Sequence, residues 1–66
     1  MLAAERHAVI LDRLAQQSGV RVGELALALG VSEMTVRRDI DTLEERGLLV
    51  RVHGGAVRPG ISARGA

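Results

Sequence analysis

The sequence predicts a small, mainly α domain of the α+β class, in which three helices precede a two-stranded antiparallel hairpin. Apolar residues recur at helical spacing in three segments, and glycine-containing breaks separate these segments. Two short runs containing valine then flank a His-Gly-Gly turn, which is typical of a hairpin. At 66 residues the chain has room for one domain, and its core must be aliphatic because the sequence contains no Phe, Tyr or Trp.

The first helix is predicted from about Ala4 to Gln17. Four residues follow the i, i+3, i+4, i+7 pattern of an amphipathic helix: His7, Ile10, Leu11 and Leu14. We expect His7 to contribute to packing on this stripe. Gly19 is expected to end the helix in the left-handed conformation. Residues 20–22 (VRV) alternate, but they are too few to predict more than an isolated strand.

The second helix is predicted over residues 23–30 (GELALALG), with Leu25, Ala26 and Leu29 buried. Its start is weak, because Val22 or Gly23 occupies the position where an N-terminal cap would carry a polar side chain. Gly30 is expected to end this helix and to open the turn that leads to the third one.

The third helix is signalled more strongly. Ser32 is a favourable N-cap, since its hydroxyl can accept a hydrogen bond from the backbone N–H of Met34 or Thr35. Three residues share the predicted inner face: Val36, Ile40 and Leu43. Gly47 is expected to end the helix. Asp39 lies nearer the core than its neighbours, so we expect it to bond to an arginine or a backbone group of another element.

Residues 48–52 (LLVRV) predict a strand in which Leu49 and Arg51 point away from the other three residues. Residues 53–55 (HGG) then form a tight turn, and residues 56–58 return as the second strand. Residues 59–66 (PGISARGA) are unpatterned and predict a linker or a frayed tail. Residues 3–58 therefore predict a three-helix winged helix-turn-helix with a small antiparallel β-wing.

Charge is distributed unevenly along the chain. Residues 1–45 contain five arginines and all eight acidic residues, whereas residues 46–66 contain four arginines and no acid. This asymmetry indicates either a polyanionic partner or a basic tail on a neutral domain. The chain lacks cysteine, a membrane-length apolar run and any grouping typical of a catalytic or metal site. We therefore expect no enzyme activity, no cofactor and no membrane partner.

In a winged helix-turn-helix the helix after the tight turn enters the major groove of DNA, and its outer face meets the base edges. A helical wheel places a polar set on the outer side of the first turns, and we expect it to face the bases: Ser32, Met34, Thr35 and Arg38. Arg37 and Ser32 are expected to hold phosphates. The alternative is that Arg37 and Arg38 only pair with residues one turn away, such as Asp41.

The hairpin predicts a second contact. Arg51 and His53 are expected at its tip, where Gly54 would let the backbone approach a phosphate closely. The competing interpretation is that residues 53–55 serve only the geometry of the turn.

The chain resembles the N-terminal DNA-binding domain of the DeoR family of bacterial transcriptional repressors. The resemblance covers residues 5–57, and its most specific parts are VSEMTVRRDI and LEERGLLVRVHGGA, together with ELA in the second helix. It implies that Val20 to Asp39 is the helix-turn-helix segment and that the helix from Ser32 reads operator DNA. Gly23 departs from the family pattern, in which a polar or acidic residue would be expected, and this weakens the second helix more than the function.

The resemblance also implies a larger C-terminal domain, absent from this chain, that binds a phosphorylated sugar or a related metabolite and drives oligomerisation. Residues from Pro59 onward would then begin the interdomain linker. The expected protein is a cytoplasmic repressor of carbohydrate or related metabolic genes that binds double-stranded DNA as a homo-oligomer. The alternative is a winged helix used as a protein–protein interaction or dimerisation module.

Overall fold

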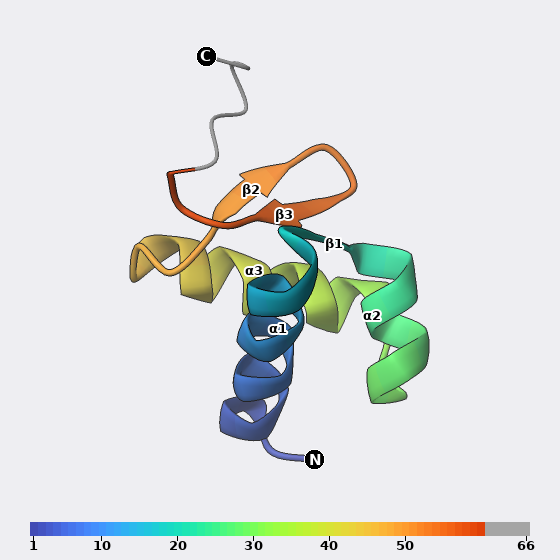
Figure 1. The fold of residues 1–66 in the computed structure, drawn as a ribbon. Helices are drawn as coiled ribbons and strands as arrows, with labels where there is room; N and C mark the ends of the chain where they lie inside the picture. The colour runs from blue at the N-terminus through green and yellow to red at the C-terminus, as the bar shows by residue number, and fades with distance from the viewer. Residues whose placement is uncertain (61–66) are drawn as a thin grey trace.

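The structure is a computed structural model that describes residues 1–60 (Figure 1). Within this range the helices are α1 (Ala3–Gln17), α2 (Val22–Leu29) and α3 (Glu33–Glu45). The strands are β1 (Gly19–Arg21), β2 (Val50–Val52) and β3 (Gly55–Val57). This order confirms the predicted three-helix winged helix-turn-helix. The small sheet lies along one side of α3, α1 packs against both α3 and β1, and α2 flanks the end at which α3 begins.

The sheet is antiparallel, and β3 lies in its centre between β1 and β2. Ala56 is the partner of Val20 on one side and of Arg51 on the other. The prediction of an isolated strand at residues 20–22 was therefore wrong: β1 begins one residue earlier and gains the hydrogen bonds of a three-stranded sheet. The second wing strand is also shifted by one residue from the predicted 56–58.

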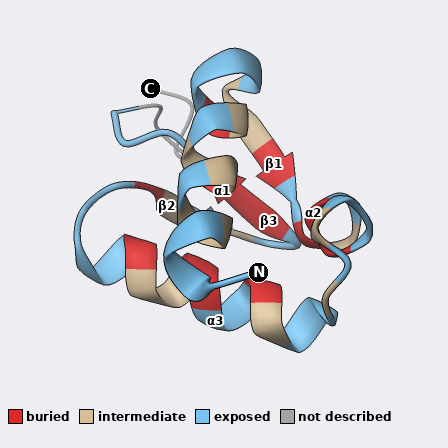
Figure 2. Cartoon of the chain, turned by 90° about the horizontal axis from the view of Figure 1, so that it is seen from below, coloured by how far each residue is buried: buried red, intermediate tan, exposed pale blue. Residues whose placement is uncertain are grey.

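The core lies where the three helices and the sheet meet, and the outer surfaces of the helices are exposed (Figure 2). All of its hydrophobic residues are aliphatic, as the composition requires: Ile10, Leu14, Val20, Val22, Leu25, Ala26, Val36, Ile40, Leu43, Leu49 and Ala56. A domain of about 60 residues buries only about 60% of the surface of its unfolded chain. The buried contacts of α3 with the rest of the domain are therefore a substantial part of its stability.

The first helix ends differently from the prediction. Ser18, not Gly19, adopts the positive φ of 69°, and its N–H donates to the Leu14 carbonyl at 3.1 Å. Gly19 is extended because it is the first residue of β1 and pairs with Val57. The chain therefore has to turn one residue earlier.

The start of α2 lacks a side-chain cap, as predicted. The wing supplies a substitute, because the N–H of Val22 donates to the Gly54 carbonyl at 2.9 Å. Leu25 and Ala26 are buried as predicted, whereas Leu29 is only half-buried. Gly30 ends the helix in the left-handed conformation.

The third helix ends at Glu45, and Gly47 terminates it in the left-handed conformation as predicted, but the strand that follows begins only at Val50. The N–H of Leu48 donates to the Leu43 carbonyl at 3.0 Å, and the N–H of Gly47 donates to the Glu44 carbonyl at 2.9 Å. These two bonds form a Schellman motif, which uses Leu48 in the helix terminus. The predicted alternation from residue 48 was therefore wrong: Leu48 is exposed and Leu49 is buried.

Pro59 and Gly60 form a turn after β3. The remainder of the predicted linker, residues 61–66, lies outside the described part of the chain.

Candidate nucleic-acid interface

The start of α3 has the polar cap that the sequence predicts. The hydroxyl oxygen of Ser32 accepts from the backbone N–H of Thr35 at 3.1 Å, and the hydroxyl donates to Thr35 Oγ1 at 3.0 Å. Both hydroxyls lie at the first turn of the helix, where unpaired backbone N–H groups and the helix dipole favour a negative charge. This end of α3 can therefore accept a phosphate, although Glu33 places one carboxylate beside it.

The two arginines of α3 differ in their surroundings. Arg37 Nη2 lies 3.1 Å from Glu33 Oε1, in an exposed i,i+4 pair of a kind that contributes about 0.3–0.5 kcal/mol. Arg38 Nη2 contacts the thioether sulfur of Met34 at 3.9 Å, and within residues 1–60 it has no carboxylate partner. Neither arginine pairs with Asp41, but Arg37 does pair with a carboxylate one turn away, so the interpretation as a simple ion pair applies to Arg37 and, within residues 1–60, not to Arg38.

Arg38 and Met34 thus form an exposed patch one turn into α3. Met34 is 60% exposed. The contact with the neutral thioether leaves the charge of Arg38 uncompensated and its remaining N–H donors available to a planar acceptor.

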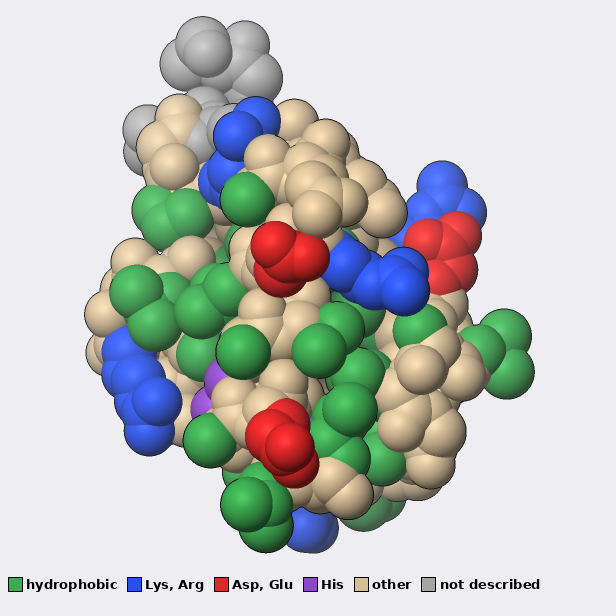
Figure 3. All heavy atoms as spheres, turned by 60° about the horizontal axis from the view of Figure 1, so that its bottom comes forward, with side chains coloured by type: hydrophobic (Ala, Val, Ile, Leu, Met, Phe, Trp, Pro, Cys, Tyr) green, Lys and Arg blue, Asp and Glu red, His purple; other side chains and the backbone are tan. Residues whose placement is uncertain are grey.

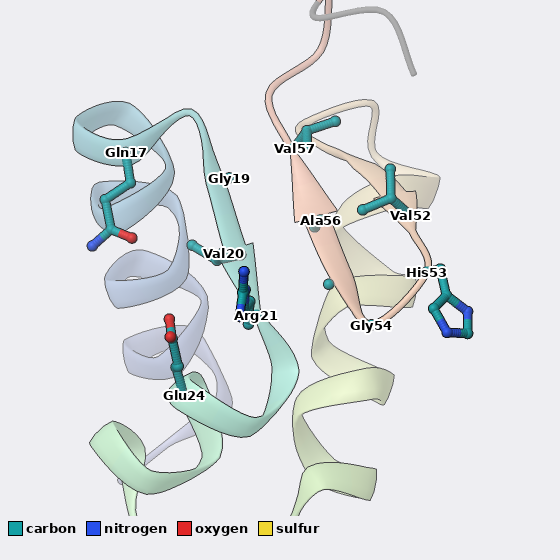
Figure 4. A pocket seen from close by; sticks show the side chains of 11 residues that line it. Gln17, Gly19, Val20, Arg21, Glu24, Val52, His53, Gly54, Ala56 and Val57 are labelled. Carbon is teal, nitrogen blue, oxygen red and sulfur yellow. The ribbon is translucent and has the colours of Figure 1, made fainter. Parts of the chain in front are cut away.

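The wing turn places His53 and Gly54 at the tip of the hairpin, as predicted. His53 is exposed, and its side chain points away from the sheet (Figure 4). Gly54 has a φ of +77°, which favours glycine. Gly55 has a different role, since a Cβ there would lie 2.0 Å from the Val20 carbonyl oxygen of β1. The second glycine is therefore required by the packing of the sheet.

Arg51 is not at the tip, and its predicted location was wrong. It is the central residue of β2, and its Nη1 lies 2.6 Å from Asp41 Oδ1 of α3. Its backbone N–H donates to Glu44 Oε2 at 2.9 Å. The side chain turns toward α3 because alternation in β2 directs it away from Val50 and Val52.

Asp39 is the one buried charged residue in the described part of the chain, with 4% of its surface exposed. Its carboxylate accepts from Arg6 Nε at 2.6 Å and from Arg6 Nη2 at 3.1 Å, and His7 Nε2 lies 3.1 Å from Oδ1. This confirms the expected bond to a neighbouring element and identifies that element as α1. His7 belongs to the same polar contact as well as to the apolar stripe.

The environment of Asp39 favours its charged form. Burial by itself raises the pKa of the Asp39 carboxyl, but the hydrogen bonds from Arg6 and His7 and the charge of Arg6 outweigh this effect. The pKa of Asp39 is therefore lowered below its ordinary value. The same carboxylate raises the pKa of Arg6. Asp39 thus anchors α3 to α1, whereas Arg37 and Arg38 lie on the exposed surface of the helix.

The face of the domain that carries the N-terminal end of α1 shows no continuous basic patch that would compete with α3 for DNA. In Figure 3 arginine and acidic side chains are interspersed there among apolar ones. Within residues 1–60 no group of three or more His, Cys, Asp or Glu could hold a metal ion. None of the helices described here is long and apolar enough to cross a membrane.

The fold and the exposed, capped third helix define a winged helix-turn-helix domain. Comparison with known proteins gives the family. The family model described as the DeoR-like helix-turn-helix domain matches residues 6–61. The chain therefore belongs to this family, whose members are DNA-binding domains of transcriptional regulators and not enzymes.

Its relatives are named as regulators. The uncharacterized HTH-type transcriptional regulator FruR of Bacillus subtilis is 50% identical over 58 residues, which cover 88% of this chain and 23% of that protein. The HTH-type transcriptional regulator GlpR of Haloferax volcanii is 47% identical over 57 residues, 86% of this chain and 22% of that protein. UlaR of Shigella sonnei is 46% identical over 56 residues, 85% of this chain and 22% of that protein.

The chain thus spans less than a quarter of the length of these curated relatives. No solved structure matches it.

Proposed function

We propose that this domain binds double-stranded DNA sequence-specifically, with the first turns of α3 in the major groove. Arg38 carries this proposal, because it is an exposed arginine that contacts the thioether of Met34 and has no carboxylate partner among residues 1–60. A guanidinium in this position can form two parallel hydrogen bonds to the O6 and N7 atoms of a guanine. Thr35 and Met34 would meet neighbouring base edges.

Four further residues would hold the DNA backbone: Ser32, Arg37, His53 and Gly54. Ser32 and Arg37 lie at the positive end of α3, and the other two lie at the wing tip, beside the N-terminus of α2. Arg51 would reach a phosphate from β2. These contacts position the domain on the duplex, whereas the base contacts of α3 select the sequence.

In its biological setting the domain would be the reading head of a cytoplasmic transcriptional repressor of carbohydrate or related metabolic genes. A phosphorylated sugar or related metabolite, bound by another domain, would relieve repression. If the full protein acts as a dimer, its operator should have two half-sites about 34–36 Å apart or a multiple of that distance. These statements rest on the resemblance to the DeoR family, and the names of the relatives support the role of a transcriptional regulator.

A salt titration of duplex binding tests the proposal. Counterion release at about four to six phosphates predicts a slope of about −4 to −5 in a plot of log affinity against log salt concentration. A flat line would instead favour the alternative of a protein-interaction module. The exposure of Leu27 in α2 supports that alternative, because this apolar side chain is 87% exposed.

A further inference from the structure

Arg51 is held by two acidic residues of α3 through two different groups. Glu44 accepts its backbone N–H, and Asp41 accepts its guanidinium. Because β2 is an edge strand, this N–H points away from the sheet, and Glu44 gives it the partner that a further strand would give. The strand is thus fixed to α3 independently of where the Arg51 side chain goes.

The ion pair between Arg51 and Asp41 is exposed to solvent, although the backbone of Arg51 is fixed to α3. The two side chains retain 48% and 49% of their exposure. Water therefore screens the attraction, and the pair is weak despite a separation of 2.6 Å. A stronger or more concentrated negative charge nearby would take the guanidinium from Asp41.

Asp41 also lies on the surface that is proposed to meet DNA. It follows Arg37 by four residues and Arg38 by three, which places all three side chains on neighbouring positions of the helix. Asp41 thus brings the Arg51 guanidinium to the edge of the predicted DNA contact. Duplex DNA presents a dense row of phosphates at such a surface.

We propose that Asp41 is an internal substitute for a DNA phosphate, and that Arg51 exchanges Asp41 for a phosphate when the domain binds a duplex. The strand remains anchored through Glu44, so only one side chain has to move. The exchange costs the free energy of the exposed pair between Asp41 and Arg51, a cost that exists only while both residues are present. Asp41 thereby lowers the affinity for DNA of any sequence and makes the contribution of base contacts relatively larger. The inference depends on the proposed DNA binding.

The test compares the unsubstituted chain with three single variants and one double variant on short duplexes of random sequence at low salt. Asp41→Asn should tighten binding about two- to fivefold, the factor that corresponds to the loss of a weak exposed pair. Arg51→Ala should weaken binding and make the salt slope shallower by about one unit. Glu45→Gln is the matched control, because it removes a carboxylate of the same helix that contacts no arginine within residues 1–60.

The exchange predicts that Asp41→Asn gains more affinity than Glu45→Gln, and that this excess disappears in the Arg51→Ala background. An Asp41→Asn variant that binds no tighter than the unsubstituted chain would overturn it. An excess gain that persists without Arg51 would overturn it as well. A chain that binds no duplex at all would refute the proposed function itself, and the unsubstituted protein alone reveals that outcome.

Discussion

Two aspartate–arginine contacts lie only two residues apart on α3, and both have an N–O distance of 2.6 Å. Asp39 contacts Arg6 of α1, and their side chains are 6% and 15% exposed. Asp41 contacts Arg51 of β2, and the corresponding values are 49% and 48%. Two residues apart on a helix means a rotation of about 200°, so one carboxylate faces the interior and the other faces solvent.

The comparison shows that the length of an ion pair does not determine its role. The buried carboxylate has three hydrogen-bond contacts and cannot lose them without leaving unpaired charges inside the domain. The exposed carboxylate has water as an alternative partner, and so does its arginine. The first contact therefore fixes α3 within the fold, whereas the second leaves an arginine available to a ligand.

The largest expected effect comes from removing the buried carboxylate. Asp39→Ala should lower the free energy of unfolding by about 1–3 kcal/mol, because it leaves the partly buried donors of Arg6 and His7 without their acceptor. Urea denaturation followed by circular dichroism measures this change. A loss below about 1 kcal/mol would show that Asp39 is no more structural than an exposed pair.

The pH dependence of stability sharpens the same contrast. The pKa of Asp39 is lowered from its ordinary value of 3.8 by folding, so the folded state favours the charged carboxylate. Its contribution to stability is therefore complete above that value and is lost as the pH falls through the lower pKa of the folded state. Unfolding of the unsubstituted chain should show this loss, and Asp39→Asn should lack it. Identical pH profiles for the two proteins would contradict the assignment.

Arg38 extends the comparison to an arginine with no carboxylate partner in the described residues. Arg38→Ala should leave the stability nearly unchanged but weaken binding to a preferred duplex by about 1–3 kcal/mol and reduce sequence preference. Binding to a panel of duplexes, selected from a random pool with the unsubstituted protein, measures both effects. Equal weakening on every duplex would make Arg38 a phosphate contact.

The smallest effect is expected at the exposed pair in the free domain. Asp41→Asn should change the free energy of unfolding by less than about 1 kcal/mol, because both charged groups are already half in water. Thermal unfolding without DNA gives this value. A loss as large as that of Asp39→Ala would remove the distinction between the two contacts.

Much of the fold follows from local patterns in the sequence. Helical periodicity correctly predicted that Ile10 and Leu14 of α1 are buried. The serine at position 32 correctly predicted the N-cap of α3, in which its hydroxyl accepts from the Thr35 N–H. The inward position of Asp39 on the helical wheel also predicted its structural role. These features depend on residues that are near one another in the chain, so local sequence patterns are enough to predict them.

The features that could not be predicted depend on distant residues. Arg6 lies 33 residues from Asp39, and nothing local pairs them. The location of Arg51 depends on which side of the wing packs against α3, and alternation alone does not specify this. Gly55 is required because the Val20 carbonyl approaches it, a contact that exists only once β1 joins the sheet.

The most direct test of the account is an NMR titration of the isotope-labelled chain with a duplex selected from a random pool. If α3 reads DNA, amide signals of residues 32–38 and of the wing turn at His53 and Gly54 shift first and most. Signals from the outer surface of α1 should stay in place. Shifts that spare α3 and the wing turn while another surface responds would contradict the central claim that α3 reads DNA.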